Sequence, residues 1–176
     1  MTGNRKHSFD YNYFDNIDCE KKAYFLGLLF ADGNNITSKS TEGISISLQK
    51  EDGYILEILK KDIKSDYPLI KRDKTDNRSE QIMFYVYYKG LKEKLDKIGL
   101  YQRKTYLLDF PLFLDESMMH HFIRGYFDGD GCVWNGKCKK MLVKDGKSKN
   151  GYRYRIVHNV KFNITGYTGF IKDLQN

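Results

Sequence analysis

One pattern occurs twice in this chain and restricts the folds open to it more than any other feature. The runs FLGLLFADG (25–33) and IRGYFDGDG (123–131) are largely apolar, and each ends in an acid followed by glycine. Each run is long enough for about two helical turns. Small residues stand four apart in both copies, at Gly27 and Ala31 and at Gly125 and Gly129. The spacing predicts two helices whose backbones can pack closely together.

If these helices pair side by side, the acids at their C-terminal ends, Asp32 and Asp130, converge on one point. A single helix that ends in Asp-Gly is ordinary, because glycine relieves the left-handed conformation common at a helix end. An acid there is less ordinary, since it stands at the negative end of the helix dipole and needs a compensating cation. The two copies together favour a paired-carboxylate metal site over two plain helix ends.

The positive charge of the chain is concentrated in one segment. The net charge is +7 and the isoelectric point is near 9.1. Residues 132–161 contain a single acid, Asp145, interleaved aromatic residues, and the basic residues Lys137, Lys139, Lys140, Lys144, Lys147, Lys149, Arg153, Arg155 and Lys161. A solvated lysine-rich loop is one interpretation. The nearby Trp134 and Tyr154 favour the other, a nucleic-acid interface, because such side chains contact bases and sugars as well as phosphates.

The composition is that of a globular protein and excludes several other classes. The chain has 176 residues, 40% of them hydrophobic and 30% charged, and no apolar stretch reaches membrane-spanning length. The three cysteines have no paired metal-ligand spacing, so we expect free thiols in a reducing compartment. No apolar leader is visible at the start. We therefore expect an intracellular protein with no membrane partner.

Periodicity predicts an α+β fold with short antiparallel hairpins. Residues 43–49 alternate as a half-buried strand does, and Ile55, Leu59 and Ile63 follow Asp52 at helical spacing. The expected elements, in order, are helix 22–32, strands 34–37 and 43–49, helix 53–63, strands 69–73 and 81–88, and helix 91–99. The second copy starts similarly, with a helix capped by Asp115 and strands at 132–143 and 152–164. The sequence ITGYTGFI (164–171) then matches LQKEDGYI (48–55).

An internal duplication is the simplest account of this order. We expect a first unit over residues 1–110 and a second over 111–176. Each is expected to be a pseudo-symmetric αββαββα unit with a saddle-shaped antiparallel sheet, joined to the other through the two motif helices. The second unit is expected to be incomplete, without its last strand pair and closing helix, because the sequence ends at Asn176.

Together with the linker GLYQRKT (99–105), the paired motifs and the αββαββ order resemble the LAGLIDADG homing endonucleases, of the double-motif, monomeric type. The resemblance covers nearly the whole chain. It implies site-specific hydrolysis of double-stranded DNA at a long asymmetric target, with Mg²⁺ or Mn²⁺ as cofactor and Ca²⁺ supporting binding without cleavage. The first copy has Phe30 where the family motif often carries an earlier acid, which is usually not the metal ligand.

The resemblance also implies roles for individual residues. Asp32 and Asp130 would bind the metal, with backbone carbonyls from Ala31 and Gly129. Gln49 resembles a position that orders active-site water, and its counterpart is Thr165. Lys104 resembles a basic residue that supports the charged transition state, with Arg103 as the alternative. Asp128 is interpreted as a hydrogen-bonding residue at the helix end rather than a ligand.

In this fold the solvent face of each sheet lies in the major groove, so strand alternation predicts the side chains that read DNA. In the second unit Arg153, Arg155 and Lys161 share one parity. Weaker candidates in the first unit are Asn35, Thr37, Lys39 and Ser45.

Three hypotheses stay open at this stage. The first is a homing endonuclease encoded by a mobile element such as an intron. The second is a non-cleaving nucleic-acid-binding protein on the same scaffold, either a DNA-binding regulator or an intron maturase with RNA as partner. Two buried acids favour the first, since a pure binder has no chemical need of them. The third is a non-catalytic fragment. We expect a monomer unless the shortened second unit requires a partner chain.

Overall fold

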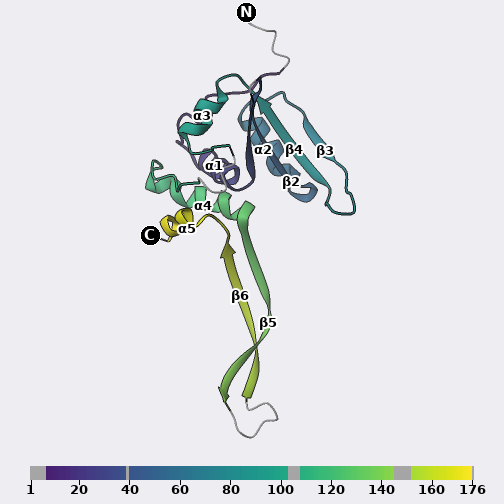
Figure 1. Cartoon of the computed structure of the whole chain (residues 1–176), viewed down its shortest axis with the longest axis vertical. Helices are drawn as coiled ribbons and strands as arrows, with labels where there is room; N and C mark the ends of the chain where they lie inside the picture. The colour runs from purple at the N-terminus through teal and green to yellow at the C-terminus, as the bar shows by residue number, and fades with distance from the viewer. Residues whose placement is uncertain (1–6, 39, 103–107, 145–151, 176) are drawn as a thin grey trace, which may run out of the picture. The chain divides into compact units, whose positions relative to one another are not determined.

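The computed structural model describes residues 7–38, 40–102, 108–144 and 152–175 (Figure 1). The chain divides into two compact units, one made of Met1–Asp130 with Gly166–Asn176 and the other of Gly131–Thr165. The first mixes helices with an antiparallel sheet, and the second is an antiparallel hairpin, so the predicted α+β class is confirmed. A division into two sequence repeats at residue 110 stays a prediction.

The elements follow the predicted order closely. The helices are α1 (Glu20–Asp32), α2 (Gly53–Asp62), α3 (Leu91–Lys97), α4 (Glu116–Asp130) and α5 (Thr168–Leu174), with a short 3₁₀ helix at Lys50–Asp52. The strands are β1 (Gly33–Thr37), β2 (Glu42–Gln49), β3 (Leu69–Arg72), β4 (Gln81–Tyr87), β5 (Gly131–Lys144) and β6 (Tyr152–Ile164). The order α4-β5-β6-α5 thus repeats the order α1-β1-β2-α2. None of the described helices has the length and apolar character needed to cross a membrane.

Strands β1 to β4 form one antiparallel sheet in the order β1-β2-β4-β3. Ile46 pairs with Gly33 on one side and with Phe84 on the other, so these residues share a face. Ile46 and Phe84 are buried. Leu59 of α2 and Leu95 of α3 line the same apolar interior. The helices therefore cover one face of the sheet and leave its other face open.

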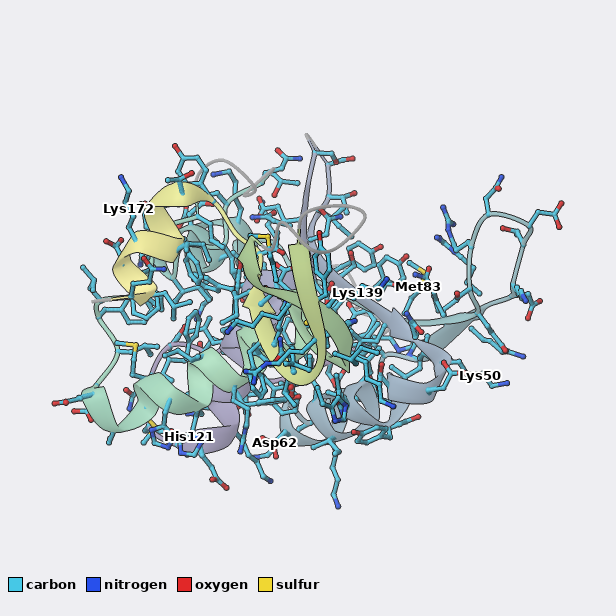
Figure 2. All side chains as sticks on the ribbon, turned by 90° about the horizontal axis from the view of Figure 1, so that it is seen from below. Lys50, Asp62, Met83, His121, Lys139 and Lys172 are labelled. Atoms are coloured by element: carbon cyan, nitrogen blue, oxygen red, sulfur yellow. The ribbon has the colours of Figure 1, made fainter. Side chains whose placement is uncertain are left out.

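The segment before α1 closes this core from the side. The hydroxyl of Tyr13 donates a hydrogen bond of 2.5 Å to Asp62, at the end of α2. Lys94 of α3 forms an ion pair of 2.6 Å with Asp15. In Figure 2, Asp62 is labelled on α2, and Met83 on the four-stranded sheet. These contacts attach the segment to two helices that lie far from it in the sequence.

A second apolar cluster joins α4 and α5. Phe122 and Phe170 are fully buried, and Phe110 contacts both, with ring centroids 5.8 and 5.5 Å away. The Phe122 ring also meets Phe30 of α1 edge to face at 5.2 Å. Asp115 precedes α4, and its carboxylate accepts a hydrogen bond of 2.9 Å from the Ser117 backbone. This contact confirms Asp115 as the capping residue of α4.

Candidate metal centre and nucleic-acid interface

Helices α1 and α4 pack backbone against backbone, as the two motifs predict (Figure 1). A Cβ atom built on Gly27 would lie 2.0 Å from the carbonyl oxygen of Phe122. A Cβ atom on Gly125 would lie 1.9 Å from the carbonyl oxygen of Tyr24. Real Cβ atoms do not approach backbone so closely, so both positions require glycine. The contacts are reciprocal, which means the two helices cross with near two-fold symmetry.

The same packing brings the acid-bearing ends of the helices together. A Cβ atom on Gly129 would lie 2.4 Å from Cβ of Ala31 and 2.8 Å from a carboxylate oxygen of Asp32. The Asp32 carboxylate therefore lies beside the last turn of α4, next to the residue that precedes Asp130. Asp32 is exposed and Asp130 is half-buried, so the expectation of two buried acids is wrong, and a solute can reach Asp32 directly.

Gly33, the residue after α1, does not have the left-handed conformation that is common for glycine at the end of a helix. Its φ is −68° and its ψ is 140°, which is an extended conformation. A Cβ atom there would lie 2.4 Å from the carbonyl oxygen of Leu29. Glycine is needed at this position for a close approach and not for a positive φ.

The donor atoms at this point fit a hard divalent cation. Both helices end in an acid, and neither has a basic residue in its last turn. Two carboxylates and two negative helix ends together create a potential that favours a cation. Carboxylate and backbone carbonyl oxygens are ligands that Mg²⁺ accepts, usually with retained waters. Within the described ranges, no group of three or more His, Cys, Asp or Glu side chains is placed to hold a metal. Asp32 and Asp130 therefore stay a predicted carboxylate pair.

Tyr126, one turn before Asp130 on the same helix, is affected by its charge. Burial raises the pKa of Tyr126 above its usual range, and the negative charge of Asp130 raises it further. Tyr126 thus stays protonated and remains a donor at neutral pH. The sequence interpretation had not singled it out.

Asp128 makes a contact between the two helices. The hydroxyl of Tyr24 in α1 donates a hydrogen bond of 2.8 Å to its carboxylate. The guanidinium of Arg124 lies 5.0 Å from the centre of the Tyr24 ring. The contact agrees with the interpretation of Asp128 as a hydrogen-bonding residue rather than a ligand.

The residues predicted to assist the two acids are located only by the strand or turn on which they lie. Gln49 is exposed at the end of β2, which is the same end of the sheet as Gly33 because the strands are antiparallel. Thr165 follows Ile164, the partner of Gly131 in the hairpin register. Lys104 and Arg103 lie outside the described residues. The roles of these four positions stay predictions.

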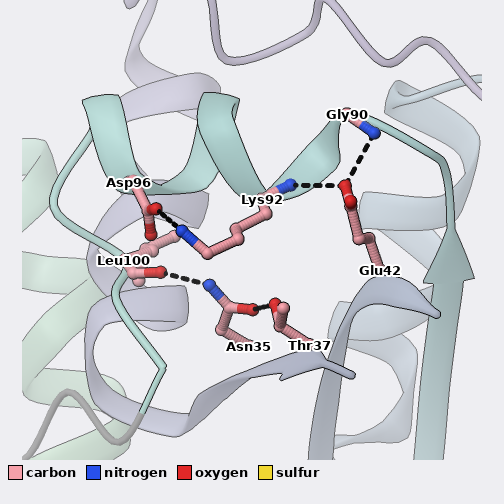
Figure 3. A network of polar contacts seen from close by, with 7 residues as sticks. All are labelled: Asn35, Thr37, Glu42, Gly90, Lys92, Asp96 and Leu100. Atoms are coloured by element: carbon pink, nitrogen blue, oxygen red, sulfur yellow. Dashed lines mark hydrogen bonds and ion pairs between the residues drawn. The ribbon is translucent and has the colours of Figure 1, made fainter. Parts of the chain in front are cut away.

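The structure corrects the expectation for two of the first unit's candidate DNA contacts. Asn35 is buried, and its side-chain nitrogen donates a hydrogen bond of 2.8 Å to the carbonyl of Leu100 (Figure 3). Thr37 donates to the Asn35 side chain at 2.6 Å. Ser45 is also buried, between Asn34 and Tyr85 in the sheet register. Asn35 and Ser45 therefore have too little accessible surface to read DNA.

Thr37 is half-buried, and Lys39 lies outside the described residues. Asn35 and Thr37 have the parity of Ile44, which faces the core, so alternation alone could have excluded them once the sheet order was known.

Sequence reasoning missed the residues that line the open face of this sheet. The rings of Tyr85 and Tyr87 lie parallel, 6.3 Å apart, and Tyr87 is exposed. A shallow pocket on this face is lined by residues that include Tyr67, Ile70, Arg72, Met83, Tyr85 and Tyr87. The alternation in FYVYY (84–88) was the available signal, since Phe84 and Val86 face the core and the tyrosines between and after them face the other way.

The β5–β6 hairpin has two chemically different faces. Register places Trp134 opposite Lys161, whose ammonium lies 5.4 Å from the indole ring, and Lys140 opposite Arg155. These residues share one face. The other face presents the exposed apolar side chains of Val133, Met141, Tyr154, Ile156, Val160 and Phe162.

Not all of the basic residues predicted to contact DNA lie on the Trp134 face. Lys137 and Lys139 lie on the apolar face of the hairpin, opposite His158 and Ile156. Lys139 is labelled on the hairpin in Figure 2. Arg153 pairs with Val143, beyond a register shift in β5.

Comparisons with known proteins give matches of structure only. No family model matches the sequence, and no curated protein does either. The I-LtrWI LAGLIDADG homing endonuclease bound to target DNA matches with a TM-score of 0.46 at 13% identity, over 79% of this chain and 65% of that one. I-SmaMI bound to cleaved DNA matches with a TM-score of 0.47 at 15% identity, over 85% of this chain and 67% of that one.

I-SmaMI bound to an uncleaved DNA target with calcium ions gives a TM-score of 0.46 at 15% identity, over 87% of this chain and 70% of that one. This chain spans less than two thirds of the length of the I-LtrWI protein. The solved structures that it resembles are LAGLIDADG homing endonucleases, the family that its two motifs resemble, and at these identities the likeness is one of fold.

Proposed function

We propose that this chain is a site-specific double-strand DNA endonuclease that hydrolyses phosphodiester bonds with a divalent metal held between α1 and α4. The observation that carries the proposal is the position of the Asp32 carboxylate, 2.8 Å from where a Cβ atom on Gly129 would lie. The two acids end helices that are locked together by glycine, so their separation is set by backbone contact. Such a fixed pair suits a reaction that needs precise placement of charge.

The metal, Mg²⁺ or Mn²⁺, would bind the scissile phosphate, assist in forming hydroxide and stabilise the leaving oxygen. The part of this chain is to hold and orient that ion through Asp32 and Asp130, with the Ala31 and Gly129 carbonyls as further donors. Gln49, at the Gly33 end of the sheet, is proposed to order water near the reacting phosphate. Lys104 is proposed to offset the charge of the transition state.

Double-stranded DNA is the proposed partner. The basic hairpin supports this assignment, because Lys140, Arg155 and Lys161 share a face with Trp134. Phosphate contacts supply affinity, whereas contacts to base edges supply the selection of a target. The open face of the four-stranded sheet, with Tyr85 and Tyr87, is proposed as the second contact surface. Together the two surfaces suit a long target whose halves differ in sequence.

The experiment is a selection from a randomised duplex library, performed in parallel with Mg²⁺ and with Ca²⁺, in which bound molecules and cleaved ends are both sequenced. We expect binding with either ion and cleavage with Mg²⁺. Asp32→Asn and Asp130→Asn should keep binding and lose cleavage. Asp128→Asn is the matched control, because it removes the same charge two residues from Asp130 and leaves an oxygen to accept the Tyr24 hydrogen bond.

The outcomes separate the two candidate functions. Duplex binding without cleavage in Mg²⁺ or Mn²⁺ contradicts the nuclease and favours the non-cleaving binding protein. Preferential capture of structured RNA in a competition arm favours a maturase. Cleavage that survives both Asp→Asn substitutions would place the chemistry elsewhere in the chain.

A further inference from the structure

The Trp134 face of the β5–β6 hairpin has a close-packed arrangement around one glycine. A Cβ atom on Gly136 would lie 2.6 Å from Cζ2 of the Trp134 indole and 3.0 Å from Cη2. The benzo edge of the indole therefore lies over Gly136, in space that any other side chain would fill. The Lys161 ammonium, from the neighbouring strand, lies 5.4 Å from the centre of the same indole. Trp134 is 39% exposed, so part of its ring meets solvent.

Asn159 lies beside this arrangement, and its amide is held by a hydrogen bond. Register places Asn159 opposite Gly136, on the same face as Trp134. Its amide nitrogen donates a hydrogen bond of 3.1 Å to the Sγ atom of Cys138, further along β5. Among the described residues, its amide oxygen accepts no hydrogen bond. Asn159 and Cys138 are both half-buried, so the amide has a preferred orientation and is still accessible to a ligand.

An amide held in this way still has one donor and one acceptor to offer. One N–H bond is directed to Cys138, which leaves the second N–H and the carbonyl oxygen. In the major groove, adenine presents a donor, the N6 amino group, next to an acceptor, N7. Guanine presents two acceptors there, cytosine a donor, and thymine an acceptor and a methyl group. The remaining groups of Asn159 therefore match adenine with two hydrogen bonds.

The hairpin has a shape and a charge pattern that can bring Asn159 to the edge of a base. A two-stranded β-ribbon fits into the major groove of B-DNA. On the same face, Lys161 lies on one side of Asn159 along the hairpin, and Lys140 with Arg155 lies on the other. Phosphate contacts by these cations would fix the position of the ribbon on the duplex, as such contacts generally do.

We infer that Asn159 is a specificity-determining residue that reads one adenine in the major groove, and that Cys138 orients its amide for this contact. The inference deepens the proposed function and rests on it, because the hairpin must meet DNA with its Trp134 face. A good bidentate contact of this kind discriminates against the wrong base by roughly 5- to 150-fold. The contact includes no phosphate, so Asn159 contributes to target selection and not to the salt dependence of binding.

The first test is a selection of bound molecules from a randomised duplex library by the full chain in Ca²⁺. We expect the selected sequences to contain an adenine that Asn159→Ala no longer prefers, with the preferences at other positions unchanged. Fixed duplexes that differ only at that position should differ in affinity by roughly 5- to 150-fold for the unmodified chain and bind Asn159→Ala nearly equally. Asn135→Ala is the matched control, because Asn135 is exposed on the opposite face of the hairpin, where it pairs with Val160. It should select the same sequences as the unmodified chain.

A single-atom change in the DNA tests the contact itself. The base 7-deazaadenine lacks the N7 acceptor and still pairs with thymine. At the selected position it should weaken binding by the unmodified chain by roughly 2- to 12-fold, the value of one hydrogen bond, and should not affect Asn159→Ala. Equal weakening of both proteins means that another residue contacts N7, and it contradicts the inference.

Substitutions of Cys138 test the orientation of the amide. Cys138→Ala removes the acceptor of the Asn159 hydrogen bond, so we expect the preference for adenine to fall. Cys138→Ser keeps an acceptor at this position and should restore most of the preference. A Cys138→Ala protein with the full preference for adenine overturns the role of Cys138.

The salt dependence of binding separates failure of this inference from failure of the proposed function. Asn159→Ala should keep the slope of log affinity against log salt concentration, whereas Lys161→Ala should reduce it. If Asn159→Ala selects the same sequences as the unmodified chain with the same preferences, the inference is overturned and the proposed function is unaffected. If the unmodified chain selects no duplex sequence, both are overturned.

Discussion

Gly125 lies directly against the backbone of Tyr24, so closely that a methyl group on it would come within 1.9 Å of the Tyr24 carbonyl oxygen. Relief of such a contact requires one helix to move, because backbone cannot rotate away as a side chain can. We expect Gly125→Ala to lower the free energy of unfolding by about 1–3 kcal/mol, as overpacking generally does. Urea unfolding followed by circular dichroism measures the change.

The control for this prediction is Gly169→Ala in α5. A Cβ atom there would meet nothing nearer than 3.5 Å, which is an ordinary contact. Alanine is the better helix former, so this substitution should leave stability unchanged or raise it by up to about 1 kcal/mol. Equal losses at the two glycines would argue that the helix pair is not packed through Gly125.

The raised pKa of Tyr13 predicts that the protein loses stability in alkaline solution. Burial raises its pKa, and the hydrogen bond to Asp62 and the charge of that acid raise it further. The folded chain therefore keeps a proton that the unfolded chain releases above its pKa of about 10. The contribution of the neutral phenol is complete below that pH and is lost progressively as the pH rises from there toward the higher pKa of the folded state. Thermal unfolding between pH 8 and 11 should show this decline, and Tyr13→Phe should make it shallower. An unchanged slope would contradict the assignment.

Substitution of Asn35 is expected to lower the stability of the fold and to leave DNA binding unchanged. Its side chain bonds the Leu100 carbonyl from a buried position, so Asn35→Ala leaves a buried acceptor without its donor. We expect the free energy of unfolding to fall by about 1–3 kcal/mol. Affinity for duplex DNA, measured well below the unfolding temperature, should not change. The exposed neighbour Asn34, on the other face of β1, is the control, and Asn34→Ala should leave stability unchanged.

The two faces of the β5–β6 hairpin predict unequal effects of lysine substitutions. Lys161 shares a face with Trp134 and Arg155, whereas Lys137 lies among the apolar side chains. Lys161→Ala should weaken DNA binding and reduce the slope of log affinity against log salt concentration by roughly 1, the value for one lost phosphate contact. Lys137→Ala should change that slope less. Identical changes would show that the hairpin does not meet DNA through the Trp134 face.

Local sequence pattern predicted the elements well because each is encoded within a short window. Strands β6 and β2 fall at 152–164 and 42–49, where alternation placed them within one residue. The close packing of α1 against α4 was also predictable, since small residues spaced four apart allow two helix backbones to approach each other. The spacing of Gly27 and Gly125 within their motifs is thus a local sequence pattern that predicts a contact between two helices far apart in the sequence.

The remaining features depend on information that no short window holds. Asn35 is buried because Leu100, far along the chain, presents a carbonyl to it. The placement of Lys137 and Lys161 on opposite faces depends on the hairpin register. The burial of Tyr126 follows from the packing of Phe170 of α5 against it. In each case a tertiary contact, and not residue type, decides the role.

Each acid is the last residue of its helix, and the next residue, Gly33 or Gly131, is the first of a strand. No linker separates the proposed metal ligands from the strands proposed to select the target. If the proposed function is right, side chains along β1 and β2 could be exchanged to change the DNA sequence that is bound without moving the metal ligands relative to these strands. An insertion at Gly33 would remove this fixed spacing, and the position of the cleaved bond within the bound DNA should then become variable.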